Sequence, residues 1–518
     1  MVDHMTIAEL DALESPLVEQ PLFFVEAPGK PGPDPKLWPE EERQAAFVTY
    51  LARTSPKITV RAVRNEGRRG FKEQRQMKRT GLKPGTFDPV DPAQFAQKLQ
   101  GVAQAQRGGR LLEALKAFNA PTQAPLLKEL QTRRAEEVQP LDTVNAIAAH
   151  LGATDIRELA KRADIATIRY DVGLLAPSRR LMGDPCRPER PTPRQRLPKS
   201  CRNTGAAPAA PAALARFDPA LPASATLQLL GAPDAWRAGF TGKGVTVAVV
   251  DTGVDLMHPD LAGSFRGGAG DWFDVHGEQP HPGDRHGHGS QITGLVTGTG
   301  ASGQTLGVAP QAKWIAARIY NDRNVGRLSQ LHRIMGWLLD PDGKPGTADA
   351  PQIVLNAWGL GDRPGQCDTE FERDLQWLRA AGMHVVFAAG NGGPMPDSSV
   401  SPANNAGALA VGALDGSGQL AMFSSRGSSA CDARPYPDLL APGELLQTTD
   451  RSAGTLAVTT RGTGTSFAAA VVAGELALLA QAHPDMPLAQ REALLRGAEG
   501  DARPPLARAL GLSVRSQP

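Results

Sequence analysis

Four short segments in the second half of the chain carry side chains that together could hydrolyse an amide bond. Asp251 follows an apolar run, His288 precedes Gly-Ser, Asn391 ends Ala-Ala-Gly-Asn, and Ser466 lies within Gly-Thr-Ser-Phe-Ala. Nucleophilic hydrolysis needs a hydroxyl, a base that takes its proton, a carboxylate that orients the base, and donors for the oxyanion. We therefore predict these roles for Ser466, His288, Asp251 and Asn391 respectively.

Each of these residues also has an alternative interpretation. Asp-Thr-Gly at 251–253 is the tripeptide of aspartic proteases, but that chemistry needs two carboxylates, and no second such tripeptide occurs. Ser466 begins an Ala-rich helical run and could be an N-cap. Asn391 stands in a glycine turn, where asparagine is commonly structural. The presence of Asp251 and His288 upstream favours the catalytic interpretation.

Two further patterns suggest other chemistry. Five of the ten histidines lie between 258 and 288, but no His-Glu-x-x-His or cysteine-histidine ligand spacing accompanies them. We therefore expect no metal site and interpret His286 as a neighbour of the base. Residues 298–303 fit the G-x-G-x-x-G pattern of dinucleotide folds. They follow a helical pattern and not a strand, so we expect no nucleotide site there.

A parallel sheet is predicted to position these residues. Continuous apolar, β-branched runs alternate with helical patterns at 245–250, 313–317, 353–355, 384–387 and 408–411. Runs of this kind are typical of strands buried on both faces, with helices packed on each side. Asp251 then lies at the carboxyl edge of a strand, where open α/β sheets build their sites.

Composition bounds the remaining possibilities. The 518 residues are 41% hydrophobic and carry 56 basic and 54 acidic side chains, a net charge of +2 that indicates neither a nucleic-acid nor an anionic membrane partner. No apolar run approaches the roughly 20 residues of a membrane span. Lys57–Lys83 carries ten Lys or Arg. We interpret it as a solvated surface, because only Phe71 is available for stacking on bases.

Shifts in composition predict four regions. The expected boundaries are a loosely ordered leader at 1–44, a small α+β domain at 45–173, a Pro/Ala/Arg-rich linker at 174–224 and a catalytic domain at 225–515. Within the small domain, Phe47–Leu51 is predicted to be a strand. The cysteine neighbourhoods predict a Cys186–Cys201 loop and a Cys367–Cys431 pair, with reduced thiols as the alternative, since spacing establishes neither.

The order Asp, His, Ser with these local motifs resembles the subtilisin-like serine proteases. Further family landmarks follow in family order at 307–310, 401–403, 410–413, 423–427 and 440–443, so the resemblance covers about 227–510. The segments at 312–317, 336–341 and 356–359 are similar to the bacillopeptidase F branch. The resemblance implies a three-layer α/β/α fold with a mainly parallel sheet.

The resemblance also implies site residues and a function. Asp251, His288 and Ser466 would form the catalytic triad, and Asn391 with the Ser466 backbone N–H would form the oxyanion hole. Substrate would bind as an added strand along Gly326, Leu328, Ala357, Trp358, Gly359, Ala388, Ala389 and Gly390. The implied activity is that of a serine endopeptidase acting through an acyl-enzyme, with an apolar or broad P1 preference. The alternative is a non-catalytic peptide-binding protein on the same scaffold.

Residues 125–170 resemble the inhibitory propeptide of these proteases. The similarity rests on a helix expected at Leu126–Glu137, an apolar stretch at Thr143–Leu151, a second helix at Asp155–Ala163 and a final strand at Ile165–Tyr170. It implies a zymogen, in which the N-terminal region assists folding and blocks the cleft until the linker is cut.

The remaining expectations concern cofactors, partners and location. No cofactor is expected for the chemistry. A structural calcium ion is doubtful, because Asp260 matches a family calcium ligand but the loop 300–303 lacks the usual asparagine. Residues 469–471 are Ala-Ala-Val, where the family usually has Ser-Pro-His. We expect a monomer whose partners are protein or peptide substrates and its own propeptide. The resemblance implies a secreted or cell-envelope protein, but the first residues lack a signal-peptide pattern. A different start site, unconventional export and an intracellular role all stay open.

Overall fold

A computed structural model of the protein describes residues 58–63, 92, 99, 101–162, 164–165, 167–176, 216–361, 363–452, 456–496 and 505–512. Two compact units are present. The first consists of Met1–Gln100, Arg110–Gly173 and Arg327–Gly336, and the second of Gly101–Gly109, Leu174–Gly326 and Trp337–Pro518.

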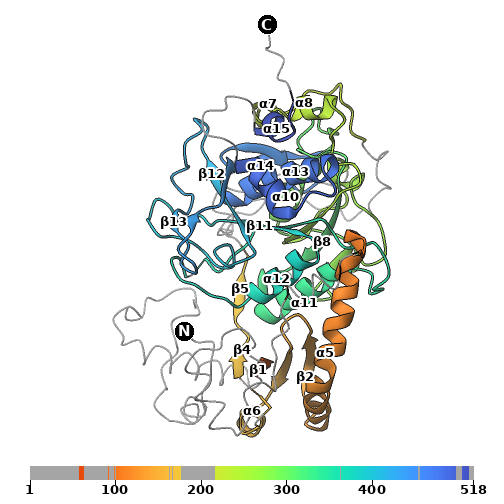
Figure 1. The fold of residues 1–518 in the computed structure, drawn as a ribbon, viewed down its shortest axis with the longest axis vertical. Helices are drawn as coiled ribbons and strands as arrows, with labels where there is room; N and C mark the ends of the chain where they lie inside the picture. Colours follow the sequence, from red (N-terminus) through yellow and green to blue (C-terminus); the bar gives the residue numbers. More distant parts are fainter. Residues whose placement is uncertain are drawn as a thin grey trace, which may run out of the picture. The chain divides into compact units, whose positions relative to one another are not determined.

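A seven-stranded sheet forms the centre of the second unit (Figure 1). Its strands are, in spatial order, β15 (Leu439–Pro442), β12 (Leu409–Leu414), β11 (His384–Ala388), β10 (Ile353–Asn356), β6 (Thr246–Asp251), β8 (Lys313–Arg318) and β7 (Trp272–Asp274). Every neighbouring pair is parallel. The five strands expected from the apolar runs are all present within two or three residues of their predicted bounds.

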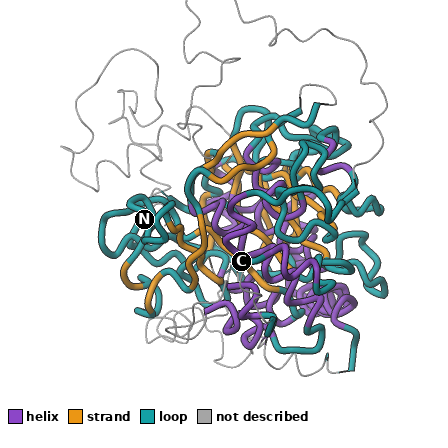
Figure 2. Tube along the Cα trace, turned by 90° about the horizontal axis from the view of Figure 1, so that it is seen from above, coloured by secondary structure: helices purple, strands orange, loops and turns teal. Residues whose placement is uncertain are grey.

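Helices cover both faces of this sheet because its central strands are apolar on both sides. All residues of β6 and β11 are buried. Helices α10 (His288–Thr297) and α13 (Thr465–Ala482) pack on one face, and α12 (Glu372–Ala380) contacts β11 from the other (Figure 1). Figure 2 shows the helices in purple and the strands in orange, joined by the teal loops. The predicted three-layer α/β/α fold is confirmed.

Helix α13 runs through the core of the second unit. Sixteen of its eighteen residues are buried, with apolar side chains all around the helix. Among the residues that the structure describes, it is the one helix that is long and apolar enough to cross a membrane, but 89% of that stretch is buried inside the protein. A helix that is apolar all round is expected in exactly this kind of interior position, so α13 is a core helix.

Smaller elements surround this core. They are α7 (Ala225–Leu230), α8 (Ala232–Arg237), α9 (Pro259–Ala262), β9 (Val325–Arg327), β13 (Gly427–Ser428), β14 (Pro435–Tyr436), β16 (Leu446–Thr449), β17 (Thr459–Gly462), α14 (Leu488–Arg496) and α15 (Pro505–Ala509). Helix α11 (Leu328–Leu339) begins in the first unit and ends in the second. Cys367 and Cys431 form a disulfide, which confirms that predicted pair. Cys186 and Cys201 lie outside the described residues.

The first unit contains a four-stranded antiparallel sheet in the order β2-β3-β1-β4. Its elements are β1 (Ile58–Val63), α5 (Gln104–Thr132), β2 (Glu136–Leu141), β3 (Ala146–Leu151), α6 (Ala153–Ala160) and β4 (Thr167–Tyr170), followed by β5 (Gly173–Leu175). Leu130, Ile147, Ile156 and Leu159 form the centre of a small core. The expected order of helix, apolar stretch, helix and strand is confirmed.

One expectation for the first unit is wrong in detail. The first helix begins at Gln104 and ends at Thr132, whereas 126–137 was expected, because Pro121 and Pro125 lie inside the helix and suggested a later start. The first part of the basic stretch at 57–83 is β1, which pairs with both β3 and β4. The solvated surface expected for this stretch stays a prediction, because residues 64–83 lie outside the described residues. The strand expected at Phe47–Leu51 lies outside the described residues.

A buried ionic network joins the start of β11 to α12 and α14. The carboxylate of Glu492 accepts a hydrogen bond from Nδ1 of His384 (2.9 Å) and ion-pairs with Arg379 (2.8 Å). Burial lowers the pKa of His384, so this histidine is neutral at neutral pH, and its Nε2 lies 3.4 Å from Arg491. Burial alone would raise the pKa of Glu492, but its bonds to His384 and Arg379 lower it to about 2.

We expect Glu492→Gln to destabilise the fold by about 2–3 kcal/mol at pH 7. Breaking a fully buried ion pair typically costs about 3–5 kcal/mol, and the loss is smaller here because the Arg379 side chain remains 25% exposed. Denaturant unfolding in a Ser466→Ala background, which prevents self-digestion, measures this change. Asp234→Asn, which removes a largely exposed pair with Arg237, is the matched control and should change stability by less than about 0.5 kcal/mol.

The pH dependence of this effect has a defined sign. Because the folded-state pKa of Glu492 is depressed, its ionisation stabilises the fold above the unfolded pKa of about 4.5, and this contribution is lost as pH falls toward 2. The stability difference between wild type and Glu492→Gln should therefore be constant above about pH 5 and shrink below it. A difference that grows on acidification would contradict this assignment.

Candidate active site

Asp251 and His288 form the best-defined part of the site. Asp251 ends β6, and both of its carboxylate oxygens lie within hydrogen-bonding distance of Nδ1 of His288, at 2.8 and 2.9 Å. Asp251 is 2% exposed. Burial, together with the Asp251 charge, raises the pKa of Tyr320, so this residue stays a neutral phenol. A carboxylate at Nδ1 fixes the tautomer of the imidazole and leaves Nε2 as the basic nitrogen.

The position of His288 is set by the first turn of α10. The carboxylate of Asp284 accepts hydrogen bonds from the backbone N–H groups of His286, Gly287 and Ser290, and from the Ser290 hydroxyl. These are the donors that a helix leaves unsatisfied at its N-terminus. A Cβ at the next residue, Gly289, would clash with the chain after Asp251, so glycine permits the close approach.

Thr252 joins the two parts of this arrangement. Its hydroxyl donates to Asp284 (3.0 Å) and accepts from the backbone N–H of Gly289 (2.9 Å). The residue after Asp251 is thereby bonded to the helix that carries His288. The strand end and the helix start are held as one rigid assembly.

Ser466 occupies the second position of α13 and is 8% exposed. The N-cap is Gly464 and makes no side-chain cap, so the N-cap interpretation of Ser466 is wrong. The Ser466 hydroxyl lies 3.3 Å from the carbonyl oxygen of Ala357. The next residue, Phe467, presents its ring perpendicular to the His288 imidazole at a centroid distance of 6.1 Å. The structure thus brings the start of α13 to the imidazole of His288.

Asn391 lies beside this helix start with a defined amide orientation. Its Oδ1 accepts hydrogen bonds from the backbone N–H of Thr465 (3.0 Å) and from the Thr465 hydroxyl (3.1 Å). Because a backbone N–H can only donate, the atom facing it must be the amide oxygen. The amide nitrogen of Asn391 is therefore directed away from Thr465 as a donor. The Thr465 hydroxyl also accepts from the N–H of Gly390 (3.1 Å).

The predicted substrate segments divide into two groups. Ala357, Trp358 and Gly359 follow β10, and Ala388 ends β11 and is followed by Ala389 and Gly390, so parallel pairing of these strands brings the two segments together. The Trp358 side chain is buried, and its ring packs edge-on against Phe371 and Phe387. Gly326 lies in β9, and Leu328 begins α11.

Val400 lies next to both segments of the first group, 357–359 and 388–390. A Cβ at Gly359 would stand 3.0 Å from Cγ1 of Val400, and one at Gly390 would stand 2.7 Å from Cγ2. The Val400 side chain is buried. It therefore fills the space next to both glycines of the predicted substrate segments.

Two of the five clustered histidines have backbone carbonyl partners. Nε2 of His258 lies 2.8 Å from the carbonyl of Val458, and Nε2 of His276 lies 2.8 Å from that of Ile319. As the sequence pattern indicated, the glycine motif at 298–303 directly follows the helix α10.

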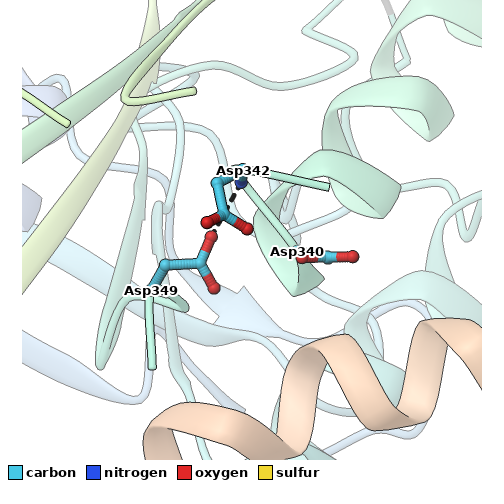
Figure 3. Close-up of side chains that lie close together, drawn as sticks. All are labelled: Asp340, Asp342 and Asp349. Atoms are coloured by element: carbon cyan, nitrogen blue, oxygen red, sulfur yellow. Dashed lines mark hydrogen bonds between the residues drawn. The ribbon is translucent and has the colours of Figure 1, made fainter. Parts of the chain in front are cut away.

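Within the described residues, the one group that could hold a metal ion consists of Asp340, Asp342 and Asp349 (Figure 3). These residues lie in what we call the 340 loop, residues 340–350. The N–H of Asp342 donates to Asp349 (2.7 Å), and Thr347 donates to Asp342 (3.0 Å). Protein donors thus already bind two of the three carboxylates.

Asp260, the residue that matches a family calcium ligand, is fully buried. Its Oδ1 accepts hydrogen bonds from the backbone N–H groups of Gly300 (2.6 Å) and Ala301 (2.7 Å), while Oδ2 has no hydrogen-bond partner. Calcium is bound by oxygen ligands, and N–H groups directed at the carboxylate take the place of a cation. The loop present here therefore does not fit calcium at Asp260.

The fold and the Asp251–His288 pair define the class of protein, and comparison with known proteins identifies it. A model of the subtilase family matches residues 242–511, so this chain belongs to the subtilase family. The predicted class, a subtilisin-like serine protease, is thereby confirmed.

Individual relatives agree with this assignment. The chain is 33% identical over 288 residues to bacillopeptidase F and 35% identical over 273 residues to serine protease AprX, both of Bacillus subtilis, covering 51% and 48% of this chain. It is 30% identical over 258 residues, 49% of this chain, to the major intracellular serine protease of the same organism and covers 73% of that protein. The chain spans 19% of the length of bacillopeptidase F and 59% of AprX.

Three residues important for the site were not found by sequence reasoning. Asp284 stands four residues before His288, and Thr465 directly precedes Ser466, so neighbourhood in the sequence could have suggested both. Val400 had no such signal. Its role depends on contact with two glycines that are distant in the sequence, and this contact exists only after folding.

Proposed function

We propose that this protein is a serine endopeptidase that hydrolyses peptide bonds through an acyl-enzyme, with Ser466 as nucleophile. The observation that carries the proposal is that both carboxylate oxygens of Asp251 lie within hydrogen-bonding distance of Nδ1 of His288, at 2.8 and 2.9 Å. The imidazole of His288 also lies next to Phe467 at the start of α13. A buried carboxylate in this position stabilises the imidazolium that forms when His288 accepts the serine proton.

The reaction follows from these roles. The Ser466 oxygen attacks the carbonyl carbon of the scissile bond while its proton passes to Nε2 of His288. The oxygen of the tetrahedral intermediate receives hydrogen bonds from the Asn391 amide and the Ser466 backbone N–H. The carbon–nitrogen bond then breaks, His288 returns the proton to the leaving amine, and water repeats the sequence to release the acyl group.

We further propose that the N-terminal region is an inhibitory propeptide, which makes the chain a zymogen. Within the second unit, the N–H of Ala176 donates to the carbonyl of Asn324 (2.9 Å); within the first, the N–H of Leu328 donates to Val172 (3.2 Å). Both bonds connect the segment after β4 to residues 324–328, where substrate is predicted to bind. Backbone pairing of this kind is how an extended peptide adds a strand.

Asp171 supports the same proposal. Its buried carboxylate accepts hydrogen bonds from the N–H (2.9 Å) and the hydroxyl (2.5 Å) of Ser329, in the first turn of α11. A carboxylate at a helix N-terminus is favoured both by these unsatisfied donors and by the helix dipole.

Val400 leads us to a narrower specificity than the apolar or broad preference expected from the sequence. Because Val400 fills the space next to Gly359 and Gly390, we propose that the P1 side chain is small. Val400→Gly should raise kcat/KM for a peptide with phenylalanine at P1 at least about tenfold relative to the matching alanine peptide, since poor steric fit in a pocket is worth about 1–3 kcal/mol. Two peptides that differ only at P1 measure this ratio, and an unchanged ratio would remove Val400 from the specificity site.

Labelling by a fluorophosphonate probe tests the enzyme proposal. The processed protein should be labelled covalently, and the label should map to the peptide that contains Ser466. Labelling that persists in Ser466→Ala would place the nucleophile elsewhere. A processed, folded protein that resists the probe would instead favour a non-catalytic peptide-binding protein on the subtilase scaffold.

A further inference from the structure

Two adjacent glycines let the first turns of α5 pack very closely against the chain around Leu339 and Pro345 within the second unit. Residues 101–109, which we call the anchor segment, belong to that unit. A Cβ at Gly108 would clash with the carbonyl oxygen of Leu339, and a Cβ at Gly109 would lie 2.7 Å from Cα of Pro345. Glycine costs about 1 kcal/mol in a helix relative to alanine. This close backbone contact is a specific reason for having two glycines here.

Glutamine side chains on the same turns add directional bonds. Nε2 of Gln104 donates to the carbonyl oxygen of Gly382, and Nε2 of Gln106 donates to that of Gly346 (2.9 Å). The groups that the anchor segment meets in these contacts are uncharged: backbone carbonyl oxygens, the Cα of Pro345 and the Cβ of Ala350. The contact is therefore one of shape and neutral hydrogen bonds, and it should depend little on salt.

The 340 loop, which contacts the anchor segment, is held in place by hydrogen bonds that do not involve that segment. In the 340 loop, Asp342 and Thr347 are bonded to each other and to Asp349, and Arg266 donates to the carbonyl of Asp349 (2.6 Å). None of these bonds involves α5. A receptor that is rigid before binding loses little entropy when the helix docks, which favours affinity.

This contact is remote from the predicted substrate strand. Leu339 ends α11 and Leu328 begins it, and a twelve-residue helix separates its ends by about 16 Å at 1.5 Å per residue. We propose that the anchor segment is a second attachment point, which holds the N-terminal region on the protease after the linker is cut and does not use the active site. This inference rests on the proposal that the N-terminal region is an inhibitory propeptide. Two linked contacts retain a fragment far longer than either contact alone.

Release of the N-terminal fragment from a nicked chain tests the anchor. The full chain, with Ser466→Ala and a recognition sequence for a site-specific protease placed between 177 and 215, is immobilised through its C-terminus and cut. Fragment release is then followed over time. The double variant Gly108→Ala with Gly109→Ala should release its fragment at least tenfold faster, although alanine favours the helix itself. The matched control, Arg110→Ala, changes an exposed residue of the same helix and should release at the wild-type rate.

A second double variant guards against misfolding of the first. Gln104→Ala with Gln106→Ala leaves the backbone packing unchanged and should speed release about 25-fold, as expected for the loss of two neutral hydrogen bonds worth about fivefold each. Release within twofold of wild type in both double variants would overturn the anchor. The inhibitor proposal is tested separately with an active, nicked chain: a fragment that stays bound but leaves peptide hydrolysis uninhibited would refute inhibition while the anchor stands.

Discussion

Replacing Ser466 by alanine is expected to lower kcat about a million-fold, the size of loss measured in subtilisin, a member of the same family. The substitution removes only a hydroxyl whose observed protein contact is the carbonyl of Ala357 at 3.3 Å, so stability should change little. Hydrolysis of a chromogenic peptide by the processed protein gives the rate, and thermal unfolding checks the fold. Ser417→Ala, which changes an exposed turn serine, is the matched control and should keep full activity.

The same substitution tests self-processing. Full-length Ser466→Ala should remain intact when it is incubated alone, whereas the wild-type chain should be cut in the linker. If the variant shortened to the same catalytic fragment, another protease would have to be responsible. Residual peptide hydrolysis within a hundredfold of wild type would contradict the assignment of the nucleophile.

Asn391→Ala is expected to lower kcat about 10²–10³-fold with little change in KM. This is the loss measured in subtilisin when a single oxyanion donor is removed, about 2.7–4 kcal/mol. The Asn391 amide would bind an oxygen that carries charge only in the transition state, so substrate binding should be nearly unaffected. Steady-state kinetics with one peptide separates the two constants. A change confined to KM would indicate a role in substrate binding instead.

Thr465 provides a comparison for Asn391. Thr465→Ala removes one of the two bonds that orient the Asn391 amide but leaves the backbone N–H bond in place. We expect a loss in kcat of about fivefold, the value of one hydrogen bond. Thr465→Ser keeps the hydroxyl and should restore most of the rate, a result that a purely structural role for the Thr465 methyl would not produce.

The central sheet could be predicted from the sequence because its inner strands are buried on both faces and appear as continuous apolar runs. The two outer strands escaped this reasoning. Strand β7 has three half-buried residues, and β15 alternates between buried and exposed residues and ends in Pro442. Edge strands bury only part of their surface, so the apolar signal that marks central strands is weak in them.

The site was predictable to a different extent. The catalytic roles of Asp251, His288, Asn391 and Ser466 were predicted from their residue types and their order in the sequence. Parallel pairing of β10 with β11 explains why the segments that follow these strands lie side by side. The contacts of Val400 could not be predicted, because they depend on how its loop folds against two glycines that are distant in the sequence. The extent of α5 was also missed, since two prolines and two glycines resemble helix breakers and only packing reveals the continuous helix.

Helix α13 joins the proposed nucleophile to the centre of the second unit's core. Ser466 stands in its first turn, and the following residues through Ala480 are buried among strands that precede it in the sequence. A nascent chain still attached to the ribosome before this helix is complete cannot close the core around it. Proteolytic competence should therefore arise only when almost the whole catalytic domain has been synthesised, which protects an unfinished chain from cutting itself.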